Sequence, residues 1–320
     1  MVNASCWDDA DRHAPSEYFW LADPTVRSWV NRRITGDPSV WPIPWFRGRA
    51  AARLPFGRAL SIGCGRGPLE RDLVRSGIAA KATGVDLTLA PVAFARRAAI
   101  EEGLGDRIAY AQAEARSLLE RERHWDAVFF HGSLHHFEDV PGILGRVRAA
   151  LKPGGLLYLD EYVGRSRGDW RLGHLILPNL AYRTLPRAAR RTHIVRSPVT
   201  DEDPTEQIAS AAILPAVERF FRVLERRDYG GNLLLLVYPN LRRPGAGGPD
   251  PAVFSAAVER LLRWEDAMLR HPALARETSA HVVLWAEPRP EPLRPDGRSP
   301  LAGEHPPHEC VGTPKGARPP

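Results

Sequence analysis

Cysteine and long apolar runs are scarce in this chain of 320 residues. Its three cysteines, Cys6, Cys64 and Cys310, are scattered without the spacing of a disulfide framework or a thiolate metal site, so we expect a reducing, cytoplasmic compartment. The first residues show no charged leader followed by an apolar run, and none is expected to direct export. The longest aliphatic run, residues 233–237, is far shorter than the roughly 20 apolar residues of a membrane-spanning helix. We therefore expect no membrane insertion.

Lysine is also scarce, and the formal net charge of +6 comes almost wholly from arginine. Such a charge could attract nucleic acid, anionic lipid or an acidic substrate. Arginine nevertheless accompanies abundant alanine, proline and glycine along the whole chain, which indicates a compositional bias rather than a binding patch. The one local cluster, residues 183–196, stays open as a site that steers a phosphorylated or carboxylated substrate.

Short apolar runs alternate with segments of helical period between Arg58 and Val163, a pattern that is typical of parallel βαβ units. One helix is predicted from Val140 to Leu151, and the proline and glycines of residues 152–155 end it. We expect an α/β fold with a doubly wound, mostly parallel, seven-stranded Rossmann-like sheet. The predicted strands are residues 58–62, 81–86, 107–112, 126–130, 156–162, 223–227 and 281–285.

The remaining segments extend this core. Residues 1–50 are rich in aromatic side chains and are predicted to form an N-terminal helical cap. The main domain spans 51–287, with a ligand-binding half at 58–163 and a second half at 164–287 that carries helical insertions after strand five. Two further helices are predicted at residues 213–222 and 254–269. Together with the last two strands, they are expected to complete the sheet. The proline-rich tail, 288–320, is expected to be disordered. The cap contains four tryptophans that either cover a ligand pocket or pack against the core: Trp20, Trp29, Trp41 and Trp45.

A glycine-rich turn follows the first predicted strand directly and precedes a helix, with the sequence Leu60-Ser61-Ile62-Gly63-Cys64-Gly65-Arg66-Gly67. Its glycines allow close approach of the backbone to a ligand, and the helix start offers unpaired N–H groups. Asp86 ends the second strand, near the spacing at which a carboxylate reaches both ribose hydroxyls of an adenosine. Pro68 stands where the dinucleotide fingerprint requires glycine, which argues against a nicotinamide cofactor.

These residues, with residues 112–115 after strand three and 152–155 before strand five, resemble the ordered motifs of class I S-adenosylmethionine-dependent methyltransferases. The resemblance is specific over residues 58–163, and flanking stretches such as 160–164 and 229–231 resemble a group of bacterial methyltransferases. It implies S-adenosyl-L-methionine as the cofactor, with the glycines along the methionine moiety, Asp86 on the ribose, and Glu114 and Ala115 at the adenine. The cofactor-binding residues that it implies are Ser61, Gly63, Cys64, Gly65, Gly67, Asp86, Leu87, Glu114, Ala115 and His131.

Two positions depart from the family pattern. Ser61 stands where the family often has a carboxylate, and Glu114 replaces a more usual aspartate. Both departures leave the fold intact, but Glu114 is also open to a plain role as a solvated residue at a helix start.

Histidines and acidic residues follow the fourth and fifth strands, where an open α/β sheet places its reacting groups. His131 and His135 are candidates for positioning or deprotonating the acceptor, and Glu161 is a second choice. The alternative is that these histidines only pack or cap. Although three histidines lie close together in the sequence, no carboxylate or thiol at ligand spacing accompanies them, so no metal is predicted.

We therefore expect an enzyme that transfers a methyl group to a small-molecule or sugar-like acceptor, at oxygen in preference to nitrogen. An inactive cofactor-binding protein is an alternative that only Ser61 supports. A nucleic-acid methyltransferase is a second alternative, motivated by the pI near 9.5, but the chain lacks an Asn-Pro-Pro-Tyr-like end of strand four and an evident RNA-binding module.

Overall fold

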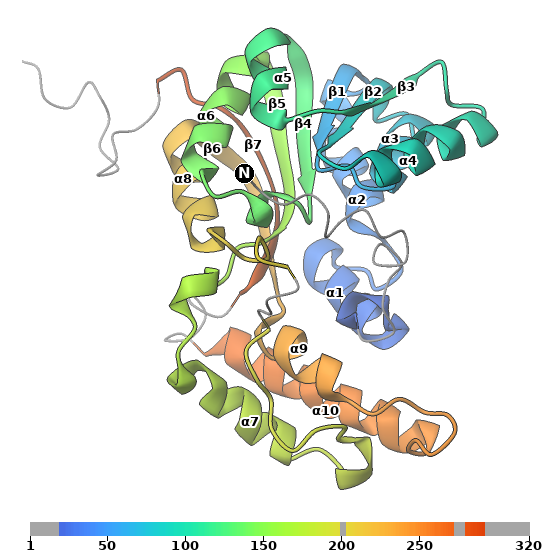
Figure 1. The fold of residues 1–320 in the computed structure, drawn as a ribbon, viewed down its shortest axis with the longest axis vertical. Coiled ribbons are helices and arrows are strands. Elements are labelled where there is room, and N and C mark those ends of the chain that lie inside the picture. Colours follow the sequence, from blue (N-terminus) through green and yellow to red (C-terminus); the bar gives the residue numbers. More distant parts are fainter. Residues whose placement is uncertain (1–18, 199–202, 272–278, 292–320) are drawn as a thin grey trace, which may run out of the picture.

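A computed structural model describes residues 19–198, 203–271 and 279–291. Seven strands form one sheet in the order β3-β2-β1-β4-β5-β7-β6 (Figure 1). The first five are parallel, and β7 runs antiparallel between β5 and β6. This confirms the predicted α/β fold with a mostly parallel sheet. The strands are β1 Phe56–Ile62, β2 Ala79–Asp86, β3 Ile108–Gln112, β4 Trp125–His131, β5 Leu151–Tyr162, β6 Phe221–Gly230 and β7 His281–Pro288.

Helices cover both faces of the sheet because side chains of each buried strand alternate between the two faces. Phe129 and Tyr158 belong to the core on one face, whereas Phe130 and Leu157 belong to the core on the other. The first face is covered by α2 Pro42–Arg49, α3 Pro68–Arg75 and α4 Leu89–Glu101, and the second by α5 Ala115–Arg121, α6 Val140–Ala150 and α8 Ile213–Phe220.

A separate layer of helices lies beyond the carboxyl ends of the parallel strands (Figure 1). It consists of α1 Pro24–Thr35, α7 Ile176–Arg183, α9 Asn232–Val237 and α10 Pro251–Arg270. The predicted insertion after strand five is thus present as α7, but α9 and α10 form a second one, between β6 and β7. Residues 254–269 are helical as predicted, yet they pack with α1, α7 and α9 rather than completing the sheet. Periodicity identified the helix but not the layer to which it belongs.

A buried carboxylate fixes this layer to the sheet. Glu265 of α10 is fully buried, and its two oxygens accept hydrogen bonds at 2.7–3.2 Å from the backbone N–H groups of residues 231–234, at the start of α9. These are donors that a helix start cannot satisfy internally. Glu265 therefore caps α9 from another helix, directly after β6 ends.

The segment before β1 shares the core of the sheet. Phe46 of α2 is fully buried and packs against Phe129, Tyr158 and Trp285. Most of the predicted tail lies outside the described residues, as do residues 1–18, while β7 continues to Pro288. Among the helices that the structure describes, none has the length and apolar character needed to cross a membrane.

Candidate active site

The glycine turn after β1 has the backbone that its sequence predicts. Gly63, Gly65 and Gly67 have φ values of +72°, +50° and +71°, a region that disfavours residues with a Cβ. Asp86, at the end of β2, accepts a 3.0 Å hydrogen bond from the N–H of Gly65 through Oδ2. Its Oδ1 accepts from the N–H and hydroxyl of Thr88, at 3.0 and 2.7 Å. The carboxylate is thus held across the ends of β1 and β2. Three of its four lone-pair sites are occupied, which leaves one for a ligand hydroxyl and a second if the Thr88 hydroxyl turns away.

A second acidic residue, which the sequence did not reveal, lies beneath this turn. Glu70 of α3 is fully buried, and burial raises the pKa of its carboxyl despite the opposing effect of the Ser61 side chain. The hydroxyl of Tyr110 donates to the carbonyl of Gly67 at 2.8 Å and lies 3.4 Å from Glu70 Oε2. Nothing in the local sequence distinguishes Glu70 from an exposed charged residue in the first turn of a helix.

The other predicted cofactor residues lie in this turn and just after β2 and β3. Cys64 is buried, and burial raises the pKa of its thiol, so it is not poised as a nucleophile. Leu87 is half-exposed beside Asp86, and Ala115 is the buried first residue of α5. Glu114 caps α5, where its Oε2 accepts from the N–H and hydroxyl of Ser117 at 3.0 and 2.7 Å. The plain role at a helix start is therefore present, and the adenine contact of Glu114 stays a prediction.

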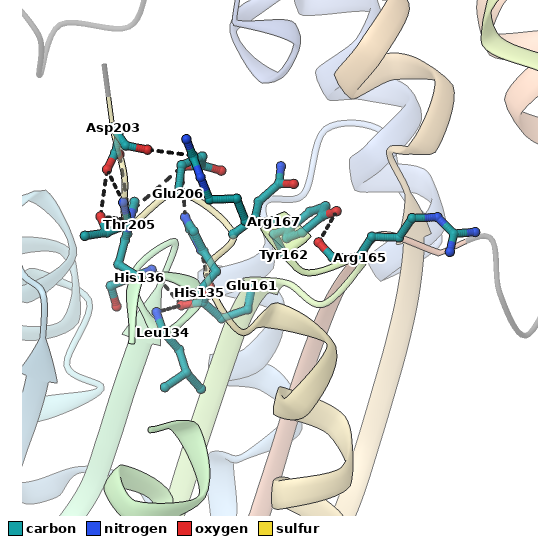
Figure 2. A network of polar contacts seen from close by, with 12 residues as sticks. Leu134, His135, His136, Glu161, Tyr162, Arg165, Arg167, Asp203, Thr205 and Glu206 are labelled. Carbon is teal, nitrogen blue, oxygen red and sulfur yellow. Dashed lines mark hydrogen bonds and ion pairs between the residues drawn. The ribbon is translucent and has the colours of Figure 1, made fainter. Parts of the chain in front are cut away.

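The loop after β4 is bound to both the glycine turn and β5. Ser133 Oγ donates to the carbonyl of Ile62 at 2.7 Å. Glu161 Oε1 accepts from the N–H groups of Ser133 and Leu134, both at 2.7 Å, and Oε2 lies 2.8 Å from His135 Nδ1 (Figure 2). Burial would raise the pKa of Glu161, but the hydrogen bond to His135, the charge of His135 and the N–H groups of Leu134 and Ser133 together outweigh burial and lower that pKa. The structure thus brings together the predicted His135 and Glu161.

The segment after α7 supplies a further carboxylate that the sequence did not reveal. Glu206 Oε2 lies 3.6 Å from His135 Nε2 and 3.9 Å from His136 Nε2. His136 Nδ1 lies 2.9 Å from the hydroxyl of Thr205 and 3.8 Å from Asp203 Oδ2. Asp203, Thr205 and Glu206 follow no periodic pattern and are far from β4 in the sequence, so only the fold shows that they meet its histidines.

His135 lies between two carboxylates and is charged at neutral pH. Burial alone would lower its pKa, but contacts with Glu161 and Glu206 outweigh burial and raise the pKa to about 10. Burial and the neighbouring charge of His135 lower the pKa of His136 to about 4. The two adjacent histidines therefore differ in charge.

His131 lies apart from this cluster. It ends β4 with a half-exposed side chain, and its Nε2 is 3.6 Å from Asp160 Oδ2. Asp160 in turn accepts a 2.7 Å hydrogen bond from the hydroxyl of Tyr229, and burial raises its pKa. The two histidines that the sequence offered as candidates thus contact different carboxylates of β5.

Aromatic rings enclose His281 at the same ends of the strands. The ring centroids of Trp20, Tyr162 and Tyr229 lie 5.0, 5.2 and 5.5 Å from that of His281. Trp20 is buried there, and Trp29 of α1 lies close to Gly230. The other two candidate tryptophans lie elsewhere, with Trp45 packed against Trp285 and Trp41 half-exposed beside Arg27.

Known proteins that are similar to this chain in sequence are methyltransferases. A family model described as "Methyltransferase domain" matches residues 59–155. The chain is 30% identical over 175 residues to a ubiquinone biosynthesis O-methyltransferase of Chelativorans sp., covering 48% of this chain and 68% of that protein. It is 37% identical over 146 residues to the protein of the same name from Nitrosococcus oceani, covering 45% and 59%. The matches thus span about half to two thirds of the relatives' length.

A similar solved structure is that of a geranyl diphosphate methyltransferase in complex with S-adenosylmethionine. It is 16% identical, covers 90% of this chain and 95% of its own, and has a TM-score of 0.47. On the sequence matches, the chain belongs to the class I S-adenosylmethionine-dependent methyltransferases.

Proposed function

We propose that this protein transfers the methyl group of S-adenosylmethionine to a hydroxyl group of a small-molecule acceptor. The observation that carries the proposal is the hydrogen bond from Ser133 to Ile62, because it joins the glycine turn to the loop that presents His135. The glycine turn and the His135–Glu161 pair are therefore connected through one residue, Ser133, which places them next to each other. This is the arrangement that a methyl donor and an acceptor need in order to meet.

The cofactor extends across the ends of β1 and β2. Gly63, Gly65 and Gly67 contact its methionine part, and Asp86 accepts hydrogen bonds from both ribose hydroxyls. This placement is supported by the positive φ angles of the glycines and by the fixed orientation of the Asp86 carboxylate. The remaining contacts that we propose are those of Ser61 and Cys64 in the turn, Leu87, Glu114 and Ala115 at the adenine, and His131 near the methyl group.

The reaction requires few groups from the protein. The acceptor oxygen forms a bond to the methyl carbon, the carbon–sulfur bond breaks, sulfur keeps its electron pair, and the hydroxyl proton passes to His131 or to water. The chief task of the protein is to hold the oxygen in line with the sulfonium and exclude water. We assign that task to His131, which positions the acceptor or accepts its proton, and to His135, which is already charged and therefore only positions the acceptor. Glu161 holds the ring of His135 in place.

The choice of oxygen and of a small molecule draws on the relatives, whose names are ubiquinone biosynthesis O-methyltransferase. The helical layer of α1, α7, α9 and α10 lies beyond the ends of the strands, on the side where we place the acceptor. We place the reaction in the cytoplasm.

The test uses the full chain with S-adenosylmethionine and separated fractions of a cell extract. We expect S-adenosylhomocysteine to form with the small-molecule fraction, together with a product that is one methyl group heavier and is labelled at oxygen. Formation that depends instead on the nucleic-acid or protein fraction would overturn the proposal. Cofactor binding without turnover in any fraction would favour the inactive binding protein.

A further inference from the structure

Three potential metal ligands from distant parts of the chain converge beside the proposed acceptor site. One nitrogen from each of His135 and His136 and one oxygen of Glu206 all lie within 4.8 Å of one another. Figure 2 shows the two imidazoles below Glu206, with Asp203 and Thr205 to one side. The prediction of no metal rested on the lack of a carboxylate at ligand spacing, and the fold supplies that carboxylate through Glu206.

The separations suit ligands of one ion better than partners in hydrogen bonds. Glu206 Oε2 lies 3.6 Å from His135 Nε2 and 3.9 Å from His136 Nε2, whereas direct hydrogen bonds are about 2.7–3.2 Å long. Ligand atoms that each lie about 2.0–2.2 Å from one ion are at most about 4.4 Å apart. Small rotations of these side chains would therefore place all three atoms around a single cation.

Both imidazoles are oriented through their other nitrogen, as metal-binding histidines usually are. Glu161 Oε2 lies 2.8 Å from Nδ1 of His135, and Thr205 Oγ1 lies 2.9 Å from Nδ1 of His136. Asp203 Oδ1 accepts from the hydroxyl of Thr205 at 2.7 Å, which fixes that hydroxyl in turn. These contacts present both Nε2 atoms toward Glu206.

We propose that His135, His136 and Glu206 bind a divalent transition-metal ion such as Zn²⁺. Two imidazole nitrogens and one carboxylate oxygen suit this class of ion, and its binding would release the Nε2 proton of the charged His135 to solvent. Three protein ligands leave a coordination position for a water molecule or for the acceptor. The part of the metal in the reaction rests on the proposed function: the acceptor hydroxyl would bind the ion, lose its proton to water and meet the methyl group as an oxyanion. Binding of the metal itself does not rest on that function.

The experiment titrates the EDTA-treated full chain with Co²⁺, followed by visible absorption and calorimetry. We expect one equivalent to bind, with the absorption of a low-symmetry nitrogen and oxygen site, and Zn²⁺ to displace it. His136→Ala and Glu206→Gln should each weaken Co²⁺ binding by at least about 10-fold, and Glu161→Gln by about 10- to 100-fold. The matched control is His193→Ala, an exposed histidine outside the cluster, which should leave Co²⁺ affinity unchanged.

Binding of S-adenosylhomocysteine, which uses the separate Asp86 site, checks that each variant is folded. Absence of saturable Co²⁺ binding to the wild-type chain would overturn the proposal. The proposal would also be overturned if His136→Ala and Glu206→Gln both kept the wild-type affinity for Co²⁺. If Co²⁺ binds as expected but no extract fraction yields a methylated product, the metal site stands and the proposed function fails. If methyl transfer occurs but Co²⁺ does not bind, the proposed function stands and the metal site fails.

Discussion

The hydroxyl of Ser133 donates a 2.7 Å hydrogen bond to the carbonyl oxygen of Ile62, the last residue of β1. Ser133 also donates its backbone N–H to Glu161, which contacts His135. Because Ser133 is bonded to both segments, the position of the glycine turn depends on the position of the loop that carries His135. A substitution that displaces one segment is expected to displace the other.

Replacement of Gly63 by alanine should disturb this junction. A Cβ at Gly63 would lie 2.5 Å from the Cβ of Ser133, in addition to the strain of a φ of +72°. We expect Gly63→Ala to weaken S-adenosylhomocysteine binding by at least about 10-fold, by calorimetry. Gly103→Ala is the control, because Gly103 has a φ of +70° but no atom within 4 Å of its added Cβ. Equal losses of affinity in the two variants would show that the contact with Ser133 is unimportant.

Turnover should depend on the groups at the ends of β4 and β5. We expect Glu161→Gln and His131→Asn each to lower kcat, about 100-fold where a proton-transfer or positioning role is lost, and to weaken cofactor binding much less. Glu120→Gln, at an exposed ion pair with Arg146, is the matched control. Wild-type kcat in both variants would remove Glu161 and His131 from the reaction.

The helical layer should depend on Glu265 for its stability. Glu265→Ala leaves four N–H groups of α9 without their buried acceptor. We expect the free energy of unfolding to fall by about 3 kcal/mol in denaturant titrations. Glu259→Ala, at an exposed position of the same helix, should change it by less than about 0.5 kcal/mol. Similar values for the two variants would contradict the capping role.

Acid should destabilise the fold through His281. Burial lowers its pKa from 6.5 to about 4, and the hydrogen bond to the carbonyl of Gly230 does not offset this. Between pH 6.5 and 4 the unfolded chain binds a proton that the folded chain excludes, so this residue's contribution to stability falls as the pH falls. The groups that face His281 or act on its charge are Trp20, Tyr162, Tyr229, His135, Glu161 and Glu206.

The loss amounts to about 1.4 kcal/mol per pH unit from this residue. His281→Asn should flatten the pH dependence of the free energy of unfolding in that window. Above pH 7 the two proteins should have parallel pH profiles. Profiles that stay parallel down to pH 4 would show that His281 does not titrate in this way.

The parts of the site that could be predicted are local in sequence. The glycine turn and Asp86 follow consecutive strands, and in a parallel sheet the ends of those strands must lie side by side. His135 and Glu161 end neighbouring strands, so their proximity follows from the strand order. Glu206 lies in an irregular segment after α7 and Glu265 lies within α10, and no local pattern specifies how either segment packs. Glu70 resembles an ordinary surface residue until the position of Tyr110 is known.

In the proposed complex, adenosine binds across the ends of β1 and β2 with its ribose on Asp86. The most direct test is calorimetry of S-adenosylmethionine and S-adenosylhomocysteine with the wild-type chain, Asp86→Ala and the exposed control Asp106→Ala. Loss of hydrogen bonds to a charged group predicts Kd values raised by about 10- to 150-fold in Asp86→Ala and unchanged in Asp106→Ala. Equal affinity in Asp86→Ala and wild type, or no binding of either ligand to the wild-type chain, would contradict the account.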